Sequence, residues 1–192
     1  APFAQLLKAG IKAVRDFSQT SIIKPKIILH VAQLQHAVYW QENLALQGVT
    51  DYDILGLSHY YKWSTVNDFD AIAQSIAQLK AKSGKAIMIV ETAFPFTNAN
   101  ADSYNNIFWE STATAVGFPF SEQGQRSYFT ALTKAIIKGG GSGIMLWEPA
   151  WITSRLNDSW GIGSSWENNA FFDFKGNLHQ GIQFMTTPYD GL

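Results

Sequence analysis

The sequence predicts a parallel α/β fold, in which helices and buried strands alternate along a single domain covering residues 1–192. Short apolar runs at residues 27–31 and 86–90 have the composition of strands buried on both faces of a parallel sheet. Segments with apolar residues at helical spacing separate these runs, and two long loops follow predicted strands. This order favours a doubly wound sheet or a barrel, and periodicity alone does not choose between them.

The first part of the chain alternates helix and strand twice. Residues 3–17 place apolar side chains on one face of a helix, and residues 26–31 form the first predicted strand. A second helix is expected over residues 36–47, where Gly48 ends it, and residues 53–58 predict the second strand.

The same alternation continues to residue 147. Thr65 and Asp68 form a capping-box pattern that predicts the start of a helix ending near Gly84, and residues 86–90 predict the third strand. Residues 121–138 predict a further helix, followed by a fourth strand at residues 143–147.

Residues 92–120 and 149–173 are too long to be simple connections. In barrel enzymes the active site lies at the carboxyl ends of the strands, in the loops that follow them. A complete barrel needs eight strands and typically about 250 residues. Only four strands are predicted here, so the sequence is expected to be half of a (β/α)8 barrel.

Composition excludes several functions. The net charge of −1, with 14 basic and 15 acidic residues, gives no basic surface for nucleic acid. No apolar run is long enough for a membrane span, and no basic-then-apolar leader pattern is present. The absence of cysteine excludes disulfides and thiolate chemistry.

Ionisable residues follow the predicted strands: His30, His59, Glu91 and Glu148. A carboxylate directly after a buried strand is costly in a core but can face substrate at a barrel mouth, so Glu91 is the leading catalytic candidate. A structural carboxylate is the alternative for both glutamates, and a hydrogen-bonded wall residue for both histidines. The histidines lack metal-ligand spacing.

The sequence contains neither a G-x-S-x-G elbow nor a phosphate-binding glycine loop. Carboxylates with aromatic residues remain, which is the composition expected for glycoside hydrolysis, and the aromatic fraction is 14%. Trp63, Trp147 and Trp151 are candidate sugar-stacking surfaces, with ordinary core packing as the alternative.

Several strings resemble glycoside hydrolase family 53, the endo-β-1,4-galactanases that act on arabinogalactan and pectic galactan. Residues 54–60 (ILGLSHY) are similar to the family's sixth strand, residues 85–95 to its seventh, and residues 147–151 (WEPAW) to its eighth. Residues 6–15 and 26–30 resemble the segment leading through the fifth strand. The resemblance covers nearly the whole chain.

This resemblance implies a retaining enzyme whose nucleophile is Glu91 and which needs no cofactor for its chemistry. The acid/base glutamate, in an Asn-Glu pair, would lie on an absent N-terminal half-barrel, which is therefore an expected partner. His59 departs from the family's tyrosine at that position. The expected lining of the sugar cleft is His30, His59, Tyr60, Trp63, Trp147, Glu148 and Trp151.

Oxygen-bearing residues recur at every second position of the loop at residues 100–106, as in loops that bind hard cations. The resemblance implies a structural Ca²⁺ between this loop and the one after the eighth strand, and a plain Asn-rich turn is the alternative. The expected ligands are Asn100, Asp102, Tyr104, Asn106, Ser164 and Glu167.

Two other functions stay open. One is a non-catalytic carbohydrate-binding domain that keeps the aromatic cleft, and the other is a retaining barrel glycosidase for β-mannan or β-glucan. An extracellular or cell-surface location is expected, because a polysaccharide cannot enter a cell intact.

Overall fold

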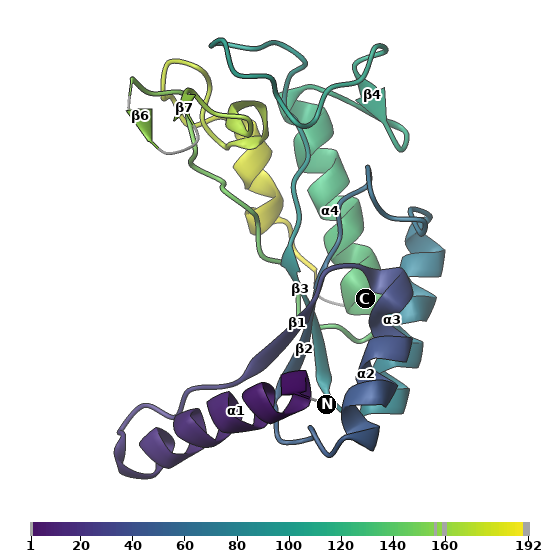
Figure 1. Ribbon diagram of the computed structural model, residues 1–192. Coiled ribbons are helices and arrows are strands. Elements are labelled where there is room, and N and C mark those ends of the chain that lie inside the picture. Colours follow the sequence, from purple (N-terminus) through teal and green to yellow (C-terminus); the bar gives the residue numbers. More distant parts are fainter. Residues whose placement is uncertain (1, 156, 159–160, 190–192) are drawn as a thin grey trace.

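The computed structural model describes residues 2–155, 157–158 and 161–189 (Figure 1). Three strands form a parallel sheet, namely β1 (Ile28–Val31), β2 (Ile54–Ser58) and β3 (Ala86–Glu91). The helices are α1 (Pro2–Thr20), α2 (Ala37–Leu46), α3 (Phe69–Ser83) and α4 (Glu122–Lys138). Short 3₁₀ helices lie at Leu34–His36, Glu167–Asn169 and Gln180–Thr186. The predicted alternation is therefore confirmed.

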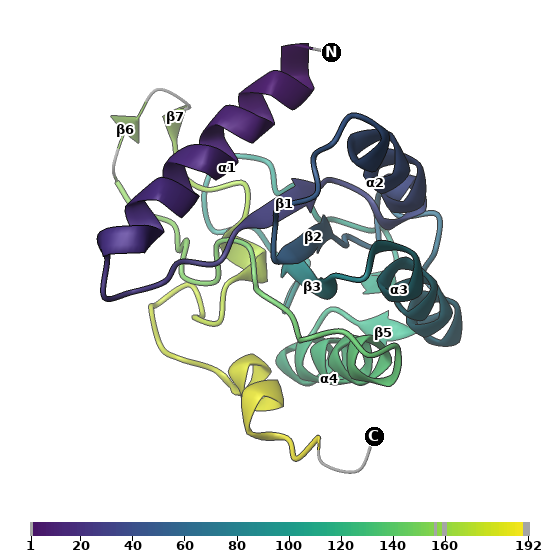
Figure 2. The same cartoon turned by 90° about the horizontal axis from the view of Figure 1, so that it is seen from below.

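Helices cover only one face of the sheet (Figure 2). On that face α2, α3 and α4 pack against buried residues such as Leu55, Leu57, Ile87 and Ile89, all fully buried. The opposite face is open, and Ile28 on it is 40% exposed. In a closed barrel this face would point inward and be filled by side chains of the other strands. The chain is a partial barrel, as the strand count predicted.

A register shift ends the pairing of β2 with β3. Gly56 lies opposite Met88 and Leu57 opposite Ile89, but Ser58 lies opposite Glu91, so Val90 is an extra residue. A bulge of this kind resets the alternation of side chains along the strand. Strict alternation would have placed Glu91 on the helix-covered face with Ile87 and Ile89, and the bulge places it with Ser58 instead.

The helix predicted from Thr65 begins later, at Phe69. Asp68 is its N-cap, and the Asp68 carboxylate accepts a hydrogen bond from the Ala71 N–H at 2.8 Å. Before it, Ser64 Oγ accepts from the Val66 N–H at 3.1 Å, and the Asn67 amide donates to the Tyr61 carbonyl at 2.9 Å. Such side-chain bonds to the backbone compete with helix formation, so this segment forms a turn.

The fourth strand is present only as a single bridge between Ile89 and Ile144. The segment still runs parallel to β3, since Met145 N donates to the Ile89 carbonyl at 2.8 Å and Trp147 N to the Thr92 carbonyl at 2.9 Å. Gly143 has a φ of 135°, outside the range of a regular strand residue. The prediction was correct in position and direction but wrong in extent.

Both long loops contain small hairpins. β4 (Thr114–Ala115) pairs with β5 (Phe118–Pro119) in the first, and β6 (Asn157–Asp158) pairs with β7 (Gly161–Ile162) in the second. In Figure 1 both hairpins lie at the end of the molecule beyond the carboxyl end of β3. Among the described residues, no helix is long and apolar enough to cross a membrane.

Candidate active site

Glu91 lies at the end of β3, and one oxygen of its carboxylate accepts two hydrogen bonds. Ser58 Oγ donates to Glu91 Oε2 at 3.0 Å, and the Tyr60 hydroxyl donates to the same oxygen at 3.2 Å. The Glu91 side chain is 27% exposed, so it is accessible from the open face. The two donors fix Oε2 and leave Oε1 as the freer oxygen.

His30, on β1, extends this hydrogen-bonded group. Its Nε2 lies 2.8 Å from Ser58 Oγ, and its Nδ1 lies 3.8 Å from Glu91 Oε1. Because Ser58 donates its only hydroxyl hydrogen to Glu91, the arrangement requires His30 Nε2 to carry a proton and donate to Ser58. Three neighbouring strands thus contribute one residue each to a chain of hydrogen bonds that ends at the Glu91 carboxylate.

Tyr60 is buried, and its burial raises the pKa of the hydroxyl above its ordinary value of 10. The neighbouring charge of Glu91, its hydrogen bond and the charge of Glu148 act in the same direction. A phenol with a raised pKa stays protonated over the ordinary pH range, so Tyr60 remains a hydrogen-bond donor to Glu91.

Aromatic rings surround the carboxylate. Trp63 is 45% exposed and meets Tyr60 edge-to-face at 5.1 Å between ring centroids. Trp147 is 37% exposed and lies 6.4 Å from Trp166, which in turn lies 6.0 Å from Tyr60. Both tryptophans pack against another ring and remain partly exposed, as sugar-stacking residues require.

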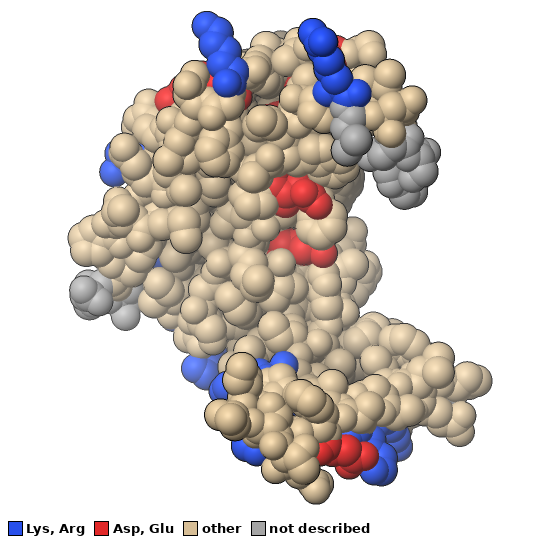
Figure 3. Space-filling view, turned by 90° about the vertical axis from the view of Figure 1, so that its left-hand side faces the viewer, with Lys and Arg blue, Asp and Glu red and all other residues tan. Residues whose placement is uncertain are grey.

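Figure 3 looks onto a hollowed side of the molecule, with acidic side chains midway along it and no Lys or Arg beside them in this view. A carboxylate on a hollowed face, without a Lys or Arg beside it in this view, suits chemistry in which positive charge develops on the substrate.

The remaining predicted cleft residues have different environments. Glu148 adopts a φ of 48°, a left-handed conformation that is strained for a residue with a side chain, and strained residues gather at functional sites. Trp151 is partly buried, with its N–H donating to the Glu148 carbonyl at 3.2 Å.

His59 is 2% exposed, and burial lowers its pKa to about 4. Its backbone N–H donates to the Glu91 carbonyl at 2.8 Å, but its imidazole does not reach the open face. The structure therefore separates His59 from the other predicted cleft residues, because Ser58 and Tyr60 on either side occupy the opposite face.

Asp102 and Glu167 come together between the two long loops. The Thr153 hydroxyl lies within hydrogen-bond distance of both carboxylates, and Ser164 N–H donates to Asp102 Oδ2 at 2.8 Å. Burial acts to raise the pKa of Asp102, but hydrogen bonds from Thr153, Ser164 and Tyr104 outweigh it and hold the pKa below its ordinary value. Backbone N–H groups also donate to both carboxylates, from Ala101 to Glu167 and from Ser164 and Tyr104 to Asp102. Two carboxylates that meet at one hydroxyl are oxygen groups of the kind that a hard divalent cation binds.

The other expected calcium ligands are engaged elsewhere. The Asn100 amide donates to the Tyr104 carbonyl at 2.8 Å, and the Asn106 amide donates to the Ala99 carbonyl at 3.2 Å. The part of the chain that the structure describes holds no group of three or more His, Asp or Glu side chains arranged for a metal. The Ser164 hydroxyl is also engaged, since it donates to the Trp151 carbonyl and accepts from the Trp166 N–H. The groups that remain for a cation are the Asp102 and Glu167 carboxylates and the Thr153 hydroxyl.

Parallel strands covered by helices on one face, with a carboxylate and exposed tryptophans at the strand ends, define a partial barrel of the glycoside hydrolase class. The family model for glycosyl hydrolase family 53 matches residues 1–185. The chain belongs to this family.

Similar sequences and structures agree with this assignment. The chain is 41% identical over 188 residues to the arabinogalactan endo-β-1,4-galactanase of Cellvibrio japonicus, covering 97% of this chain and 50% of the relative. It matches the Ignisphaera aggregans GH53 catalytic domain with a TM-score of 0.81 and 30% identity, covering 95% of this chain and 51% of that structure. A fungal β-1,4-galactanase structure shares the fold at a TM-score of 0.72 and 24% identity. The chain spans about half the length of the relatives it matches.

Some site residues escaped sequence reasoning. Ser58 ends the predicted second strand and precedes His59 and Tyr60, and this strand-end position was its one signal, but it was not counted among the cleft residues. Thr153 and Trp166 belong to a loop without periodicity. Thr153 and Trp166 gave none, because their partners are distant in the sequence.

Proposed function

We propose that this chain is one half of a retaining galactanase that hydrolyses β-1,4-galactan, with Glu91 as the nucleophile. The observation that carries the proposal is the Glu91 carboxylate, held through one oxygen by Ser58 and Tyr60 at the open face of the partial barrel. The 41% identity to a galactanase supports the choice of substrate.

The proposed attacking atom is Oε1 of Glu91, because Ser58 and Tyr60 both bind the other oxygen of this carboxylate. Oε1 of Glu91 attacks the anomeric carbon, and a C–O bond forms while the glycosidic C–O bond breaks. The leaving oxygen takes a proton from an acid glutamate about 5 to 5.5 Å from the nucleophile. Water, deprotonated by that same residue, then releases the sugar from Glu91 and restores both groups.

The acid glutamate is proposed to come from a companion half-barrel. Ile28 and Met145 are exposed by 40% and 49% on or beside the open face of the sheet, although apolar side chains fill the interior of a closed barrel. β1 also has an unpaired edge among the described strands, which favours association with further strands.

The first experiment is the native mass of the particle, compared with 21.3 kDa for this chain. A heavier particle with a second, different polypeptide supports the proposal. Galactan hydrolysis is then measured for this chain, for its companion and for both together, with β-mannan and β-glucan as comparison substrates. Activity is expected only from the mixture and only on galactan.

Matched variants test the role of Glu91 itself. E91Q in the mixture is expected to abolish turnover, whereas E110Q, which alters a carboxylate 4.0 Å from Lys62, keeps it. Full activity of E91Q would overturn the assignment. A stable monomer that binds galactan without turnover, and does so equally as E91Q, would instead identify a carbohydrate-binding domain.

A structural Ca²⁺ held by Asp102, Glu167 and Thr153 is part of the same proposal, supported by the two carboxylates that meet at one hydroxyl. The ion would tie the loop after β3 to the loop after Trp147. An extracellular or cell-surface location is proposed as well, because the proposed substrate is a polysaccharide.

A further inference from the structure

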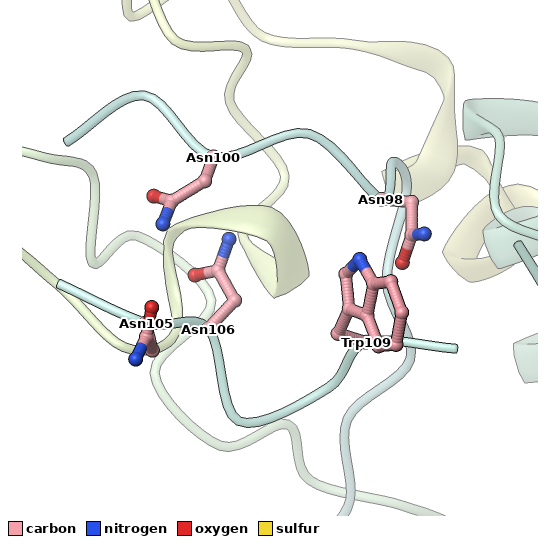
Figure 4. Close-up of a pocket in the computed structure, with 5 residues that line it drawn as sticks. All are labelled: Asn98, Asn100, Asn105, Asn106 and Trp109. Atoms are coloured by element: carbon pink, nitrogen blue, oxygen red, sulfur yellow. The ribbon is translucent and has the colours of Figure 1, made fainter. Parts of the chain in front are cut away.

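A second cavity lies in the loop that follows β3, separate from the hydrogen-bonded group at Glu91. It has a volume of about 380 Å³, within the range of about 300 to 1,000 Å³ for small-molecule sites. Figure 4 shows its lining, in which Trp109 lies beside Asn98, and Asn100, Asn105 and Asn106 lie together on the other side. The described lining residues are Asn98, Asn100, Asn105, Asn106 and Trp109.

The backbone of this loop is fixed from both sides. The buried amide of Asn168 donates to the Thr97 carbonyl at 3.0 Å and to the Phe108 carbonyl at 2.7 Å. Asn98 bonds the backbone of Glu110 through both of its side-chain atoms, at 2.8 Å and 3.2 Å. A cavity whose walls are already ordered loses little entropy when a ligand enters.

The chemistry of the lining favours an uncharged, hydroxyl-rich ligand. The described lining residues carry no charge, so an ionic ligand would meet no counter-charge. An amide group has two hydrogens and two lone pairs, and the observed bonds of Asn98 and Asn100 use one hydrogen and one lone pair of each. The Trp109 side chain is 54% exposed and can stack on a flat apolar face.

The cavity is next to the proposed cleft along the chain. Phe108 directly precedes Trp109, and its ring lies 5.9 Å from Tyr60 and 5.5 Å from Trp63. The segment that lines the cavity is therefore joined directly to the aromatic residues around Tyr60.

We propose that this cavity is a second, non-catalytic binding site for a neutral pyranose residue, with Trp109 as the stacking surface and the asparagine amides as hydrogen-bonding groups. The choice of galactan as the natural ligand rests on the proposed function. Binding of the sugar itself requires neither Glu91 nor a companion half.

The test is calorimetric titration of the full chain with β-1,4-galactotetraose. Saturable binding is expected, with W109A weakening it at least about fivefold. Y39A is the matched control, because Tyr39 is 73% exposed on α2, outside the cavity. W109A alters this cavity and leaves Glu91 and its hydrogen-bonding partners in place, so its loss of affinity separates this site from the catalytic proposal.

A second measurement needs no variant. N-bromosuccinimide oxidises exposed indoles, and mass spectrometry after proteolysis locates the modified tryptophans. Galactotetraose is expected to slow oxidation at Trp109 at least about threefold, the protection expected when most sites are occupied. Undetectable binding, unchanged affinity in a folded W109A, or no protection of Trp109 would each overturn the proposal, whatever the outcome for Glu91.

Discussion

Ser58 Oγ lies 3.0 Å from Glu91 Oε2 because a bulge in the β2–β3 pairing sets these two residues opposite each other. Leu57, one residue before Ser58, and Ile89, two residues before Glu91, are paired in ordinary register, and both are fully buried under the helices. The bulge therefore converts a strand that supplies core residues into one that presents a carboxylate on the open face.

The S58A variant is expected to slow galactan hydrolysis by the completed barrel. Loss of a hydrogen bond to a charged group costs about 1.5–3 kcal/mol, or roughly 10- to 150-fold in rate when the interaction is needed in the transition state. The measurement is kcat/KM in the reconstituted mixture. S142A, at an exposed serine after α4, is the control, and equal rates for the two variants would contradict the role of Ser58.

Variants of Tyr60 and its neighbour Tyr61 form a matched pair that tests the contribution of hydrogen bonds to Glu91. Y60F removes the donor that lies 3.2 Å from Glu91 and is expected to lower the rate about 10-fold or more. Y61F removes a buried hydroxyl for which no hydrogen-bond partner is found among the described residues, so turnover is expected to be unchanged and stability unchanged or slightly higher. Thermal unfolding and kcat are measured for both. A larger rate loss in Y61F would reverse the assignment.

The burial of His59 predicts how the stability of the folded protein depends on pH. Its pKa in the folded protein is lowered to about 4 by burial, against an ordinary value of 6.5. Between these values the unfolded chain binds a proton that the folded chain does not, so stability falls as pH falls from about 6.5 to about 4. The slope from this group is at most about 1.4 kcal/mol per pH unit.

The H59F variant is expected to lose that component of the pH dependence. Its unfolding free energy is measured by urea titration at several pH values in this window, with H36Q as the control for a histidine that is not buried. If H59F and the parent keep the same slope, burial of His59 is not its source.

The cluster of Asp102 and Glu167 predicts a response to calcium. A cation that binds only the folded state raises stability by about 2.7 kcal/mol at 100 times its Kd. Addition of CaCl₂ after chelation is expected to raise the unfolding temperature of the parent but not of E167Q. D173N is the control, since Asp173 instead binds Asn177 in a separate turn. An unfolding temperature that changes with neither chelator nor Ca²⁺ would contradict the proposed calcium site.

The sequence by itself determined the order of helices and strands and the position of Glu91 at the end of β3. Continuous apolar runs mark strands buried on both faces, and helical spacing marks the segments that cover them, so these features are local and predictable. The aromatic strings similarly indicated which loops surround the strand ends, and Tyr60, Trp63 and Trp147 do lie around Glu91 or its neighbours.

Only the tertiary structure decided which face each side chain occupies. The bulge at Ser58 brings Glu91 to the open face, and His59 is buried on the other. The single bridge at Ile144 and the Thr153 contact with two carboxylates likewise depend on residues far apart in the chain. A change of one residue in register reverses the face of every following side chain, and local sequence patterns do not encode that register.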